Sequence, residues 1–367
     1  MRIPYLDLKR QYRTIQNEMD GAVSAFIADQ HFVGGDKVAT FESKFAKAHH
    51  SKHCIGTGNA TDALFVVLKA LQIGAGDEVI VPAHGWISAA EMVALTGAKV
   101  VFADVESKTF GICATDVASK INSKTKAIIA IHLYGQICEI EALCELAEHH
   151  KIHLIEDCAQ AHFATFKGQS AGNWGIASVF SFYPSKMLGA YGDGGAILTN
   201  SDELALACRK FANHGGLSKN NHEIKGINSR LDALQAQVLM VKLNFVEDWI
   251  DQRREIAAFY SGQLKGVGDI QVPCMVDHSK PNFHIYVIRT QHRDALKRHL
   301  ENLGIGTEIH YPVASPFTTA FNDNNWEASD FPLSYQLQNE VLSLPIYPEL
   351  SSEELHFIVE HIQLFFA

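Results

Sequence analysis

The sequence predicts an α/β protein with a mostly parallel central sheet covered by helices and a smaller α/β domain at its C-terminal end. Three observations predict this class. Short apolar strands alternate with helical stretches from Cys54 onward, their apolar runs are continuous, and a second alternation begins after Pro273. Continuous runs are typical of strands that are buried on both faces. A chain of 367 residues is long enough for two domains and a sizeable core.

Apolar spacing and turn residues place the individual elements. An amphipathic helix is expected over 5–28, and Asp36 is expected to cap the next helix. The strands of the first unit are expected at 54–58, 79–82, 100–103, 128–133, 154–157, 179–182 and 196–198. The helices between the earlier strands are expected at 60–72, 86–96, 115–121 and 139–150.

A long helical run is expected over 231–264, with one apolar face that we assign to core packing. The second unit is expected to hold strands at 283–290 and 307–311 and helices at 293–303, 334–342 and 352–365. Ser351 and Glu354 have the spacing of a capping box. We therefore divide the chain into an N-terminal arm at 1–30, a large domain at 31–245 and a small domain at 246–367.

Composition excludes several classes of protein. The content of 47% hydrophobic and 20% charged residues is that of a soluble globular enzyme. A net charge of −10 without a basic run argues against nucleic-acid binding. Seven cysteines without a C-x-x-C pair indicate a reduced, cytoplasmic protein. No export signal or membrane span is expected, and none of the 19 histidines falls in a metal-ligand pattern.

The segment 181–195, SFYPSKMLGAYGDGG, places one lysine, Lys186, in a turn rich in glycine and serine after a buried strand. Lysines normally lie solvated on polar faces, and that remains the simpler interpretation. The alternative is a lysine that forms a Schiff base with a carbonyl cofactor. Ser181 is then a candidate ligand of a phosphate group.

A second candidate site is the turn GTGNATD at 56–62. Asn59 can cap the helix that Ala60 and Thr61 open, and exposed amides at a helix start bind anions. An ordinary turn between strand and helix is an equally good interpretation. The segment lacks the lysine of a P-loop and the spacing of a dinucleotide fingerprint.

Polar and aromatic residues follow other strand ends. Asp157 closes a buried strand and needs a cationic partner, for which a protonated pyridine nitrogen would serve. Gln160 can donate to a phenolate oxygen. Trp86 lies where ligands collect in open α/β sheets, although a core position is as plausible. Glu156 and His162 are expected to be rim or core polar residues.

Taken together, these motifs resemble pyridoxal phosphate enzymes of aspartate-aminotransferase fold, in the DegT/DnrJ/EryC1/StrS group of sugar-nucleotide aminotransferases. The resemblance extends from Asp7-Leu8-x-x-Gln11-Tyr12 through His310-Tyr311-Pro312 to Leu344-Pro345. It implies that Lys186 forms the Schiff base and moves protons, that Asp157 pairs with the ring nitrogen, and that Gln160 contacts the ring hydroxyl. It further implies a phosphate site and a ring face made by Ala60, Thr61, Ser181, Trp86 and, from the partner subunit of a homodimer, Asn228.

Within this group, the lysine segment is similar to that of members that aminate C3 of dTDP-3-keto-6-deoxyhexoses, with L-glutamate as the amino donor. This resemblance implies a role in the synthesis of deoxyamino sugars for the O-antigen of lipopolysaccharide. C4 members more often read SFHxxKxxTTGEGG. The resemblance places His310, Tyr311 and Tyr183 near the sugar, and charge makes Lys219, Arg230 and Arg10 candidate pyrophosphate contacts. Three residues depart from the family pattern and bear on the sugar pocket, namely Ala60, Phe163 and Met187.

Several alternatives stay open at this point. C4 amination of a dTDP- or UDP-4-keto sugar is one, and the sugar configuration is not determined. The related 3-dehydratases carry histidine in place of the lysine, so Lys186 argues against them. A regulatory or sensor protein of this fold would carry a DNA-binding domain, for which the N-terminal arm is too short. A cofactor-free module that binds sugar nucleotides is the remaining alternative.

Overall fold

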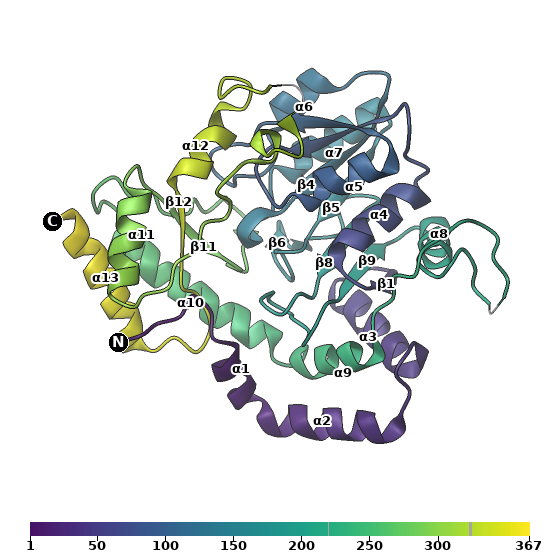
Figure 1. Cartoon of the computed structure of the whole chain (residues 1–367), viewed down its shortest axis with the longest axis horizontal. Coiled ribbons are helices and arrows are strands. Elements are labelled where there is room, and N and C mark those ends of the chain that lie inside the picture. The colour runs from purple at the N-terminus through teal and green to yellow at the C-terminus, as the bar shows by residue number, and fades with distance from the viewer. Residues whose placement is uncertain (219, 323–324) are drawn as a thin grey trace.

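The computed structural model describes residues 1–218, 220–322 and 325–367, and it follows the predicted alternation of strands and helices (Figure 1). The helices are α1 (Leu8–Thr14), α2 (Gln16–Asp29), α3 (Gly35–Ala48), α4 (Ala60–Ala70), α5 (Ser88–Thr96), α6 (Ala114–Lys120), α7 (Ile140–His150), α8 (Asp202–Ala212), α9 (Ala233–Lys242), α10 (Val246–Leu264), α11 (Arg293–Asn302), α12 (Pro332–Glu340) and α13 (Ser352–Phe366). The strands are β1 (His53–Thr57), β2 (Glu78–Pro82), β3 (Lys99–Ala103), β4 (Thr125–Ile131), β5 (His153–Asp157), β6 (Thr165–Phe166), β7 (Gln169–Ser170), β8 (Ala177–Ser181), β9 (Gly195–Thr199), β10 (Ser279–Lys280), β11 (Tyr286–Arg289) and β12 (Val341–Leu344).

The central sheet has seven strands in the order β1-β9-β8-β5-β4-β2-β3. Strand β9 runs antiparallel to both of its neighbours, β1 and β8, and the other pairs are parallel. The predicted α/β class with a mostly parallel sheet is therefore confirmed. Because six strands point the same way, their carboxyl ends meet at one edge of the sheet.

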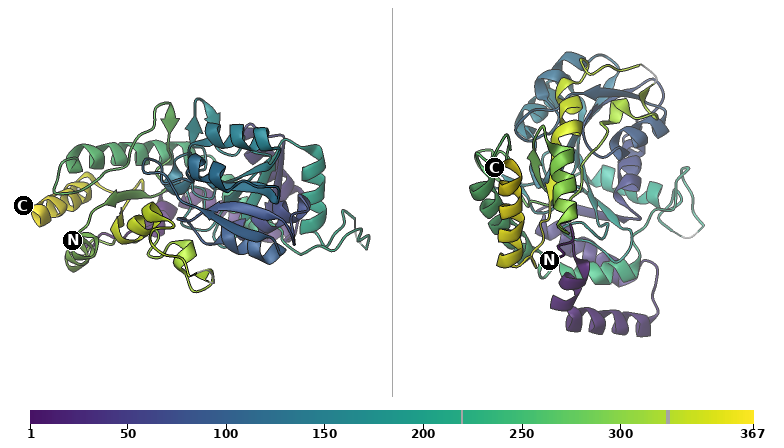
Figure 2. Two further views of the ribbon diagram at one scale, coloured as in Figure 1. Left: turned by 90° about the horizontal axis from the view of Figure 1, so that it is seen from above. Right: turned by 60° about the vertical axis from the view of Figure 1, so that its left-hand side comes forward.

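Helices cover both faces of this sheet, so successive residues of each strand enter different cores (Figure 2). Ile129 and Ile131 of β4 pack in a cluster with α4, α5 and α8. Ile128 and Ala130 pack on the opposite face with α3, α6, α7 and α9. Burial on both faces is the physical reason for the continuous apolar runs in the sequence.

The C-terminal part is organised around the antiparallel pair of β11 and β12, which packs with α11, α13 and the second half of α10. Ile3 of the N-terminal segment enters the same core. The capping box is confirmed, since the Ser351 hydroxyl accepts from the Glu354 amide at 3.1 Å and Glu354 accepts from the Ser351 amide at 2.9 Å. The division into an arm and two domains stays a prediction.

The helices near the N-terminus differ from expectation. The helix expected over 5–28 is two helices, because the backbone leaves helical geometry at Ile15 (φ −124°, ψ 19°), and Asp7 caps the first of them. Asp36 lies inside the first turn of α3, whose N-cap is Gly34 at φ +65°. A positive φ favours glycine, so that glycine takes the cap position predicted for the aspartate.

Further differences lie where pairing across the fold overrides local propensity. The run expected over 231–264 is interrupted at residues 243–245, between α9 and α10. Residues 341–342, expected as helix, open strand β12, and 307–311, expected as strand, make one bridge from Glu308 to Ser343. Helix α8 and the small sheet of β6, β7 and β10 were not predicted.

All seven cysteines carry free thiols. Within the described ranges, no helix combines the length and the apolar character that crossing a membrane requires.

Candidate active site

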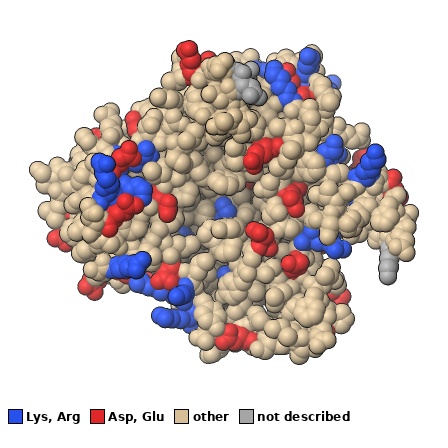
Figure 3. Space-filling model, viewed as in Figure 1, with Lys and Arg blue, Asp and Glu red and all other residues tan. Residues whose placement is uncertain are grey.

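A cavity of about 450 Å³ opens at the edge where the parallel strands end. The face seen in Figure 3 is hollowed near its centre, with basic atoms visible inside the hollow and acidic side chains around it. The cavity is lined by Asn59, Ala60, Thr61, Trp86, Ser88, Ile131, Leu133, Asp157, Ala159, Gln160, Ser181, Tyr183, Ser185, Lys186, Asp193, His284, Ile285, His310 and Tyr311.

Most of the residues that the sequence singled out therefore line one cavity. Four predicted residues do not line it or cannot be placed. Arg230 is exposed beside Asn213, and Asn228 pairs with Asn213 through the backbone. Arg10 forms an ion pair with Glu354 at 2.7 Å, which holds its guanidinium between α1 and α13. Lys219 lies outside the described residues.

Lys186 follows β8 in a loop stabilised by hydrogen bonds of its own backbone. Its amide donates to the Tyr183 carbonyl at 2.8 Å, and the amide of Ala190 returns to the Phe182 carbonyl at 2.7 Å. Among the described residues, the Lys186 ammonium has no carboxylate within 4.0 Å. Burial lowers the pKa of Lys186 to about 8, against an opposing effect of the Asp157 charge. A neutral amine at this position is a nucleophile near physiological pH.

We predict that the apo-enzyme captures pyridoxal phosphate at a rate that rises with pH about a midpoint near 8. With a pKa of about 8, roughly a tenth of Lys186 is neutral at pH 7, against less than about a thousandth of an ordinary lysine. Stopped-flow absorbance from pH 6 to 10 measures this. Because the Asp157 charge raises the pKa of Lys186, Asp157→Asn should move the midpoint to lower pH. A midpoint near 10 would contradict the prediction.

Asp157 ends β5 and is 5% exposed. One carboxylate oxygen accepts from the Ala159 amide at 2.9 Å, and no cation of the described residues lies within 4.0 Å of the other. Burial raises the pKa of Asp157, with opposing effects from the Ala159 amide and the Lys186 charge. A buried carboxylate that faces a cavity without a cationic partner fits a ligand that carries a protonated ring nitrogen.

The start of α4 forms the opposite wall. The Asn59 side chain accepts from the Asp62 amide at 2.7 Å, which confirms the predicted cap. The amides of Ala60 and Thr61 donate none of the hydrogen bonds found within the described chain. Gly195 of β9 packs so closely that an added Cβ would lie 2.7 Å from the Ala60 nitrogen. Open amides at the start of an eleven-residue helix, beside the Ser181 hydroxyl, suit a phosphate group.

Aromatic residues close the remaining side. Trp86 is 57% exposed and its ring lies 5.6 Å from that of Tyr311, tilted by 48°. Gln160 donates to the Tyr311 hydroxyl at 3.0 Å and accepts from the Tyr134 amide at 2.6 Å. One amide hydrogen of Gln160 remains for a ligand. The cavity thus offers a flat face, an open anion site, an unpaired carboxylate and an unpaired amine, and this set fits pyridoxal phosphate.

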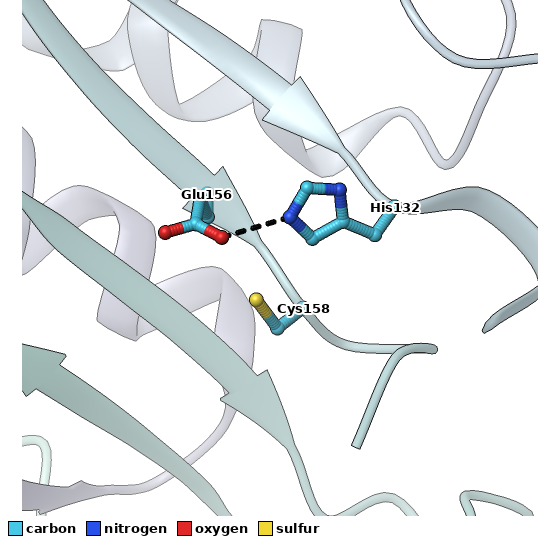
Figure 4. A group of neighbouring side chains, drawn as sticks. All are labelled: His132, Glu156 and Cys158. Atoms are coloured by element: carbon cyan, nitrogen blue, oxygen red, sulfur yellow. Dashed lines mark hydrogen bonds and ion pairs between the residues drawn. The ribbon is translucent and has the colours of Figure 1, made fainter. Parts of the chain in front are cut away.

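The sequence did not identify a buried cluster beneath the site. Glu156 and His132 are fully buried, and the His132 ring nitrogen lies 2.9 Å from a Glu156 oxygen (Figure 4). Glu156 also accepts from the amides of Gly172, Trp174 and Gly175 at 2.7–2.8 Å. Cys158 completes a group whose ligand-type atoms lie within 4.8 Å of one another. Each Glu156 oxygen already accepts two hydrogen bonds, so the cluster fastens the loop before β8 to β5. In the sequence, the burial of Glu156 is indicated by its position within an apolar strand.

We expect Glu156→Gln to lower the free energy of unfolding by about 2–5 kcal/mol. In either orientation, the amide nitrogen of glutamine would face at least one backbone N–H that now donates to Glu156, and that buried group would lose its acceptor. Chemical denaturation monitored by fluorescence measures the change. Glu141→Gln is the control, because Glu141 binds Lys167 at the exposed surface. A loss at Glu156 as small as that at Glu141 would contradict the assignment.

The departures from the family pattern affect the cavity less than the sequence suggested. Met187 is 2% exposed and packs in the core on the α3 side of the sheet. Phe163 packs its ring against His49 at 4.4 Å and holds φ at +58°, a conformation that favours glycine. Ala60 alone of the three lines the cavity. His162, expected as rim or core, is buried among Phe45, Phe180 and Phe182.

Comparisons with known proteins identify the family of this chain. The profile of the DegT/DnrJ/EryC1/StrS aminotransferase family matches residues 13–363. The chain is 40% identical to the pleiotropic regulatory protein of Geobacillus stearothermophilus, over 100% of this chain and 99% of the relative. It is also 40% identical to the dTDP-3-amino-3,6-dideoxy-alpha-D-galactopyranose transaminase of Aneurinibacillus thermoaerophilus, over 98% of each.

Solved structures show the same fold. DesV of S. venezuelae, crystallised with a ketimine intermediate, superposes with a TM-score of 0.97 at 36% identity, covering 99% of this chain and 98% of DesV. NtdA of Bacillus subtilis, with bound cofactor PMP, gives a TM-score of 0.90 at 26% identity, covering 98% of this chain and 84% of NtdA. The chain therefore belongs to the DegT/DnrJ/EryC1/StrS family of pyridoxal phosphate-dependent aminotransferases.

Proposed function

We propose that this aminotransferase transfers the amino group of L-glutamate to C3 of a dTDP-3-keto-6-deoxyhexose, giving a dTDP-3-amino-3,6-dideoxyhexose. One observation carries the proposal: an unpaired amine, an unpaired strand-end carboxylate and open helix amides share a cavity with His310 and Tyr311. The full-length similarity to a transaminase named for a 3-amino sugar supports the position of amination. The product would serve deoxyamino sugar synthesis, as for an O-antigen.

Pyridoxal phosphate, when bound, supplies a carbonyl carbon that takes up nitrogen and a ring that accepts electrons. The residues of this chain would do the rest. Lys186 removes the Cα proton of the donor in the first half-reaction and delivers a proton to C3 of the sugar in the second. Asp157 holds positive charge at the inner wall, and Gln160 and Trp86 fix the orientation of the ring. The amides of Ala60 and Thr61 with the Ser181 hydroxyl bind the phosphate.

We further propose a homodimer in which Asn228 of each subunit completes the phosphate site of the other. Asn228 does not line the cavity of its own chain. The segment between α8 and α9 extends away from the body (Figures 1 and 2) and exposes Leu217 and Ile224, by 52% and 47%. Exposed apolar side chains on a projecting segment are typical of a surface that another subunit covers.

The sugar would lie against His310, Tyr311 and Tyr183, outside the cofactor. Burial lowers the pKa of His310 to about 4, with a further effect of the Lys186 charge, so its ring is neutral at pH 7. A neutral imidazole and a phenol can bind sugar hydroxyls without attracting a second phosphate. Arg230 and Lys219 remain proposed pyrophosphate contacts on the basis of charge. The free cysteines suit the cytoplasm, where we place the enzyme.

The test is a panel of dTDP- and UDP-keto sugars with L-glutamate, with the linkage of the new amino group read by NMR. We expect amination at C3 of a dTDP sugar. Amination only at C4, or only of a UDP sugar, would overturn the substrate while leaving the reaction class intact.

A regulatory role is the second candidate, because a relative of equal identity is named a pleiotropic regulatory protein. A protein with that role alone would bind the cofactor without turning over any sugar of the panel. Single-turnover absorbance with L-glutamate and then with each sugar separates the two functions.

A further inference from the structure

Tyr134 joins two walls of the active-site cavity without lining the cavity itself. It follows β4 in the turn 133–135 and is 8% exposed. Its amide donates to the Oε1 atom of Gln160 at 2.6 Å, and its hydroxyl donates to the backbone carbonyl of His310. The cavity wall includes Gln160 and His310 but not Tyr134. Tyr134 can therefore act on a bound ligand only through these two residues.

The backbone of Tyr134 adopts a conformation that is uncommon for a bulky residue. Its φ of +60° and ψ of 3° lie in the left-handed region, which favours glycine. Such residues persist where the surrounding structure fixes them, and they cluster at functional sites. Here the Tyr134 carbonyl also accepts from the Ile285 amide at 3.3 Å. Tyr134 thus makes hydrogen bonds to three segments that are distant in the sequence, at Gln160, Ile285 and His310.

His84 extends this arrangement behind Tyr134. It is 1% exposed, and its Nε2 lies 3.1 Å from the Tyr134 hydroxyl oxygen. The hydroxyl proton is used on the His310 carbonyl, which can only accept, so the Nε2 of His84 carries the ring proton and donates. Burial lowers the pKa of His84 to about 4, against opposing effects of the His310 backbone and the Asp104 charge. The ring is therefore neutral at pH 7, and the hydrogen bonds run in one direction from His84 through Tyr134 to His310.

The residues that receive these hydrogen bonds lie in the segment 308–315, which crosses the mouth of the site between two anchored ends. Its first amide donates to a carbonyl of β12 at 3.2 Å, and its last amide donates to the Ala83 carbonyl at 2.9 Å. Between these ends, the Tyr311 hydroxyl accepts from Gln160 at 3.0 Å. The middle of the segment is thus held at two neighbouring residues, by the Tyr134 hydroxyl and by the Gln160 side chain.

We propose that Tyr134 is a positioning residue for the acceptor sugar, because its hydroxyl fixes the segment 308–315 relative to Gln160. The proposal rests on the function given above, in which His310 and Tyr311 lie against the sugar and Gln160 orients the cofactor. The amide of Tyr134 serves the cofactor side and its hydroxyl serves the sugar side. A shift of about 1 Å in a bound substrate can cost about 10²-fold in rate, so the separation of these two partners matters.

Tyr134→Phe tests this, because it removes the hydroxyl and keeps the amide that Gln160 accepts from. In a reaction of two half-reactions, kcat/KM for each substrate reports only its own half. We expect kcat/KM to fall about 10–100-fold for whichever keto sugar of the panel reacts, since the His310 carbonyl loses a buried donor. The value for L-glutamate and the absorbance of the bound cofactor should not change. An equal fall for both substrates would overturn the proposal.

Tyr260→Phe is the matched control. Tyr260 is 0% exposed, and its hydroxyl also donates to a backbone carbonyl, that of Pro345 at 2.9 Å. It packs in the core around β11 and β12 and does not line the cavity. The substitution should lower stability, as any loss of a buried hydrogen bond does, and leave both kcat/KM values unchanged. A fall for the sugar as large as that of Tyr134→Phe would overturn the proposal.

A pair of variants at His84 keeps the proposal testable if Tyr134→Phe folds poorly. Glutamine can replace the Nε2 donor of His84 with its amide, whereas leucine cannot donate. His84→Leu should lower kcat/KM for the sugar by about 3–10-fold, and His84→Gln should restore most of this loss. Equal values for the two variants would overturn the proposal.

Hydrogen exchange of the holoenzyme separates this proposal from the substrate proposal, because it needs no sugar. Tyr134→Phe should speed exchange in the peptide that covers 308–315 by about 10-fold, and Tyr260→Phe should not. Faster exchange without amination of any keto sugar would support the hold of Tyr134 on this segment and reject a keto sugar as the acceptor. Unchanged exchange in Tyr134→Phe would overturn the positioning role whatever the acceptor is.

Discussion

Lys186→Ala is expected to lower the transamination rate by about 10⁴-fold or more and to abolish the covalent attachment of pyridoxal phosphate. The substitution removes a general base, which contributes about 10²–10⁴-fold to the rate. It also removes the amine that binds the carbonyl carbon of the cofactor. The walls that suit the phosphate and the ring stay in place, so the variant should still bind the cofactor without a covalent bond. Steady-state rates and the visible absorbance of the purified protein measure both effects.

Lys242 is the matched control within the same chain. It is 1% exposed, burial lowers its pKa to about 8 as for Lys186, and it donates to the Gly189 carbonyl at 2.7 Å. It does not line the cavity. Borohydride reduction followed by peptide mapping should place the cofactor on Lys186 and leave Lys242 unmodified, because position and not basicity selects the lysine. Label on Lys242, or full activity of Lys186→Ala, would refute this assignment.

How far the sequence could predict the site depends on where each residue stands along a strand. Asp157 and Ser181 end parallel strands, and Trp86 and Lys186 lie in the segments that follow strand ends. Parallel strands place such residues at one edge whatever the details of packing. The gathering of these four residues was therefore predictable from the alternation of elements.

Other features depend on contacts between distant segments, which no local pattern encodes. In the sequence, Glu156 is only a charged residue within an apolar strand. Its role becomes visible in the structure, where backbone amides of the loop at 172–175 donate to its carboxylate. In the sequence, Arg253 is only a polar position of a long helix. In the structure, its guanidinium donates to the backbone carbonyls of residues 283, 284 and 346, which are distant in the chain. The first two residues of β12, 341–342, were predicted as the end of a helix because the pairing of β12 with β11 is decided by tertiary structure.

Asp157→Asn is the second substitution with a large expected effect, and it should separate activity from stability. Asparagine keeps the shape of the side chain and an oxygen for the Ala159 amide. It cannot hold a positive charge on the ring nitrogen. Loss of one partner of a buried ion pair costs about 3–5 kcal/mol, and if this is lost from the transition state the rate falls by about 10²–10⁴-fold.

The stability of the apo-protein should change in the opposite direction. Burial raises the pKa of Asp157 above its unfolded value, so the ionised carboxylate destabilises the folded apo-enzyme as pH rises through that pKa. A neutral asparagine removes this cost at pH 7, and the Tm of the apo-protein should equal or exceed that of the wild type. Asp202→Asn, at an exposed surface pair, should leave activity unchanged. A buried carboxylate that lowers the stability of the apo-protein is expected only where a bound ligand stabilises its charge. A fall in the Tm of apo Asp157→Asn, or retained activity of this variant, would therefore show that the charge of Asp157 does not serve the cofactor.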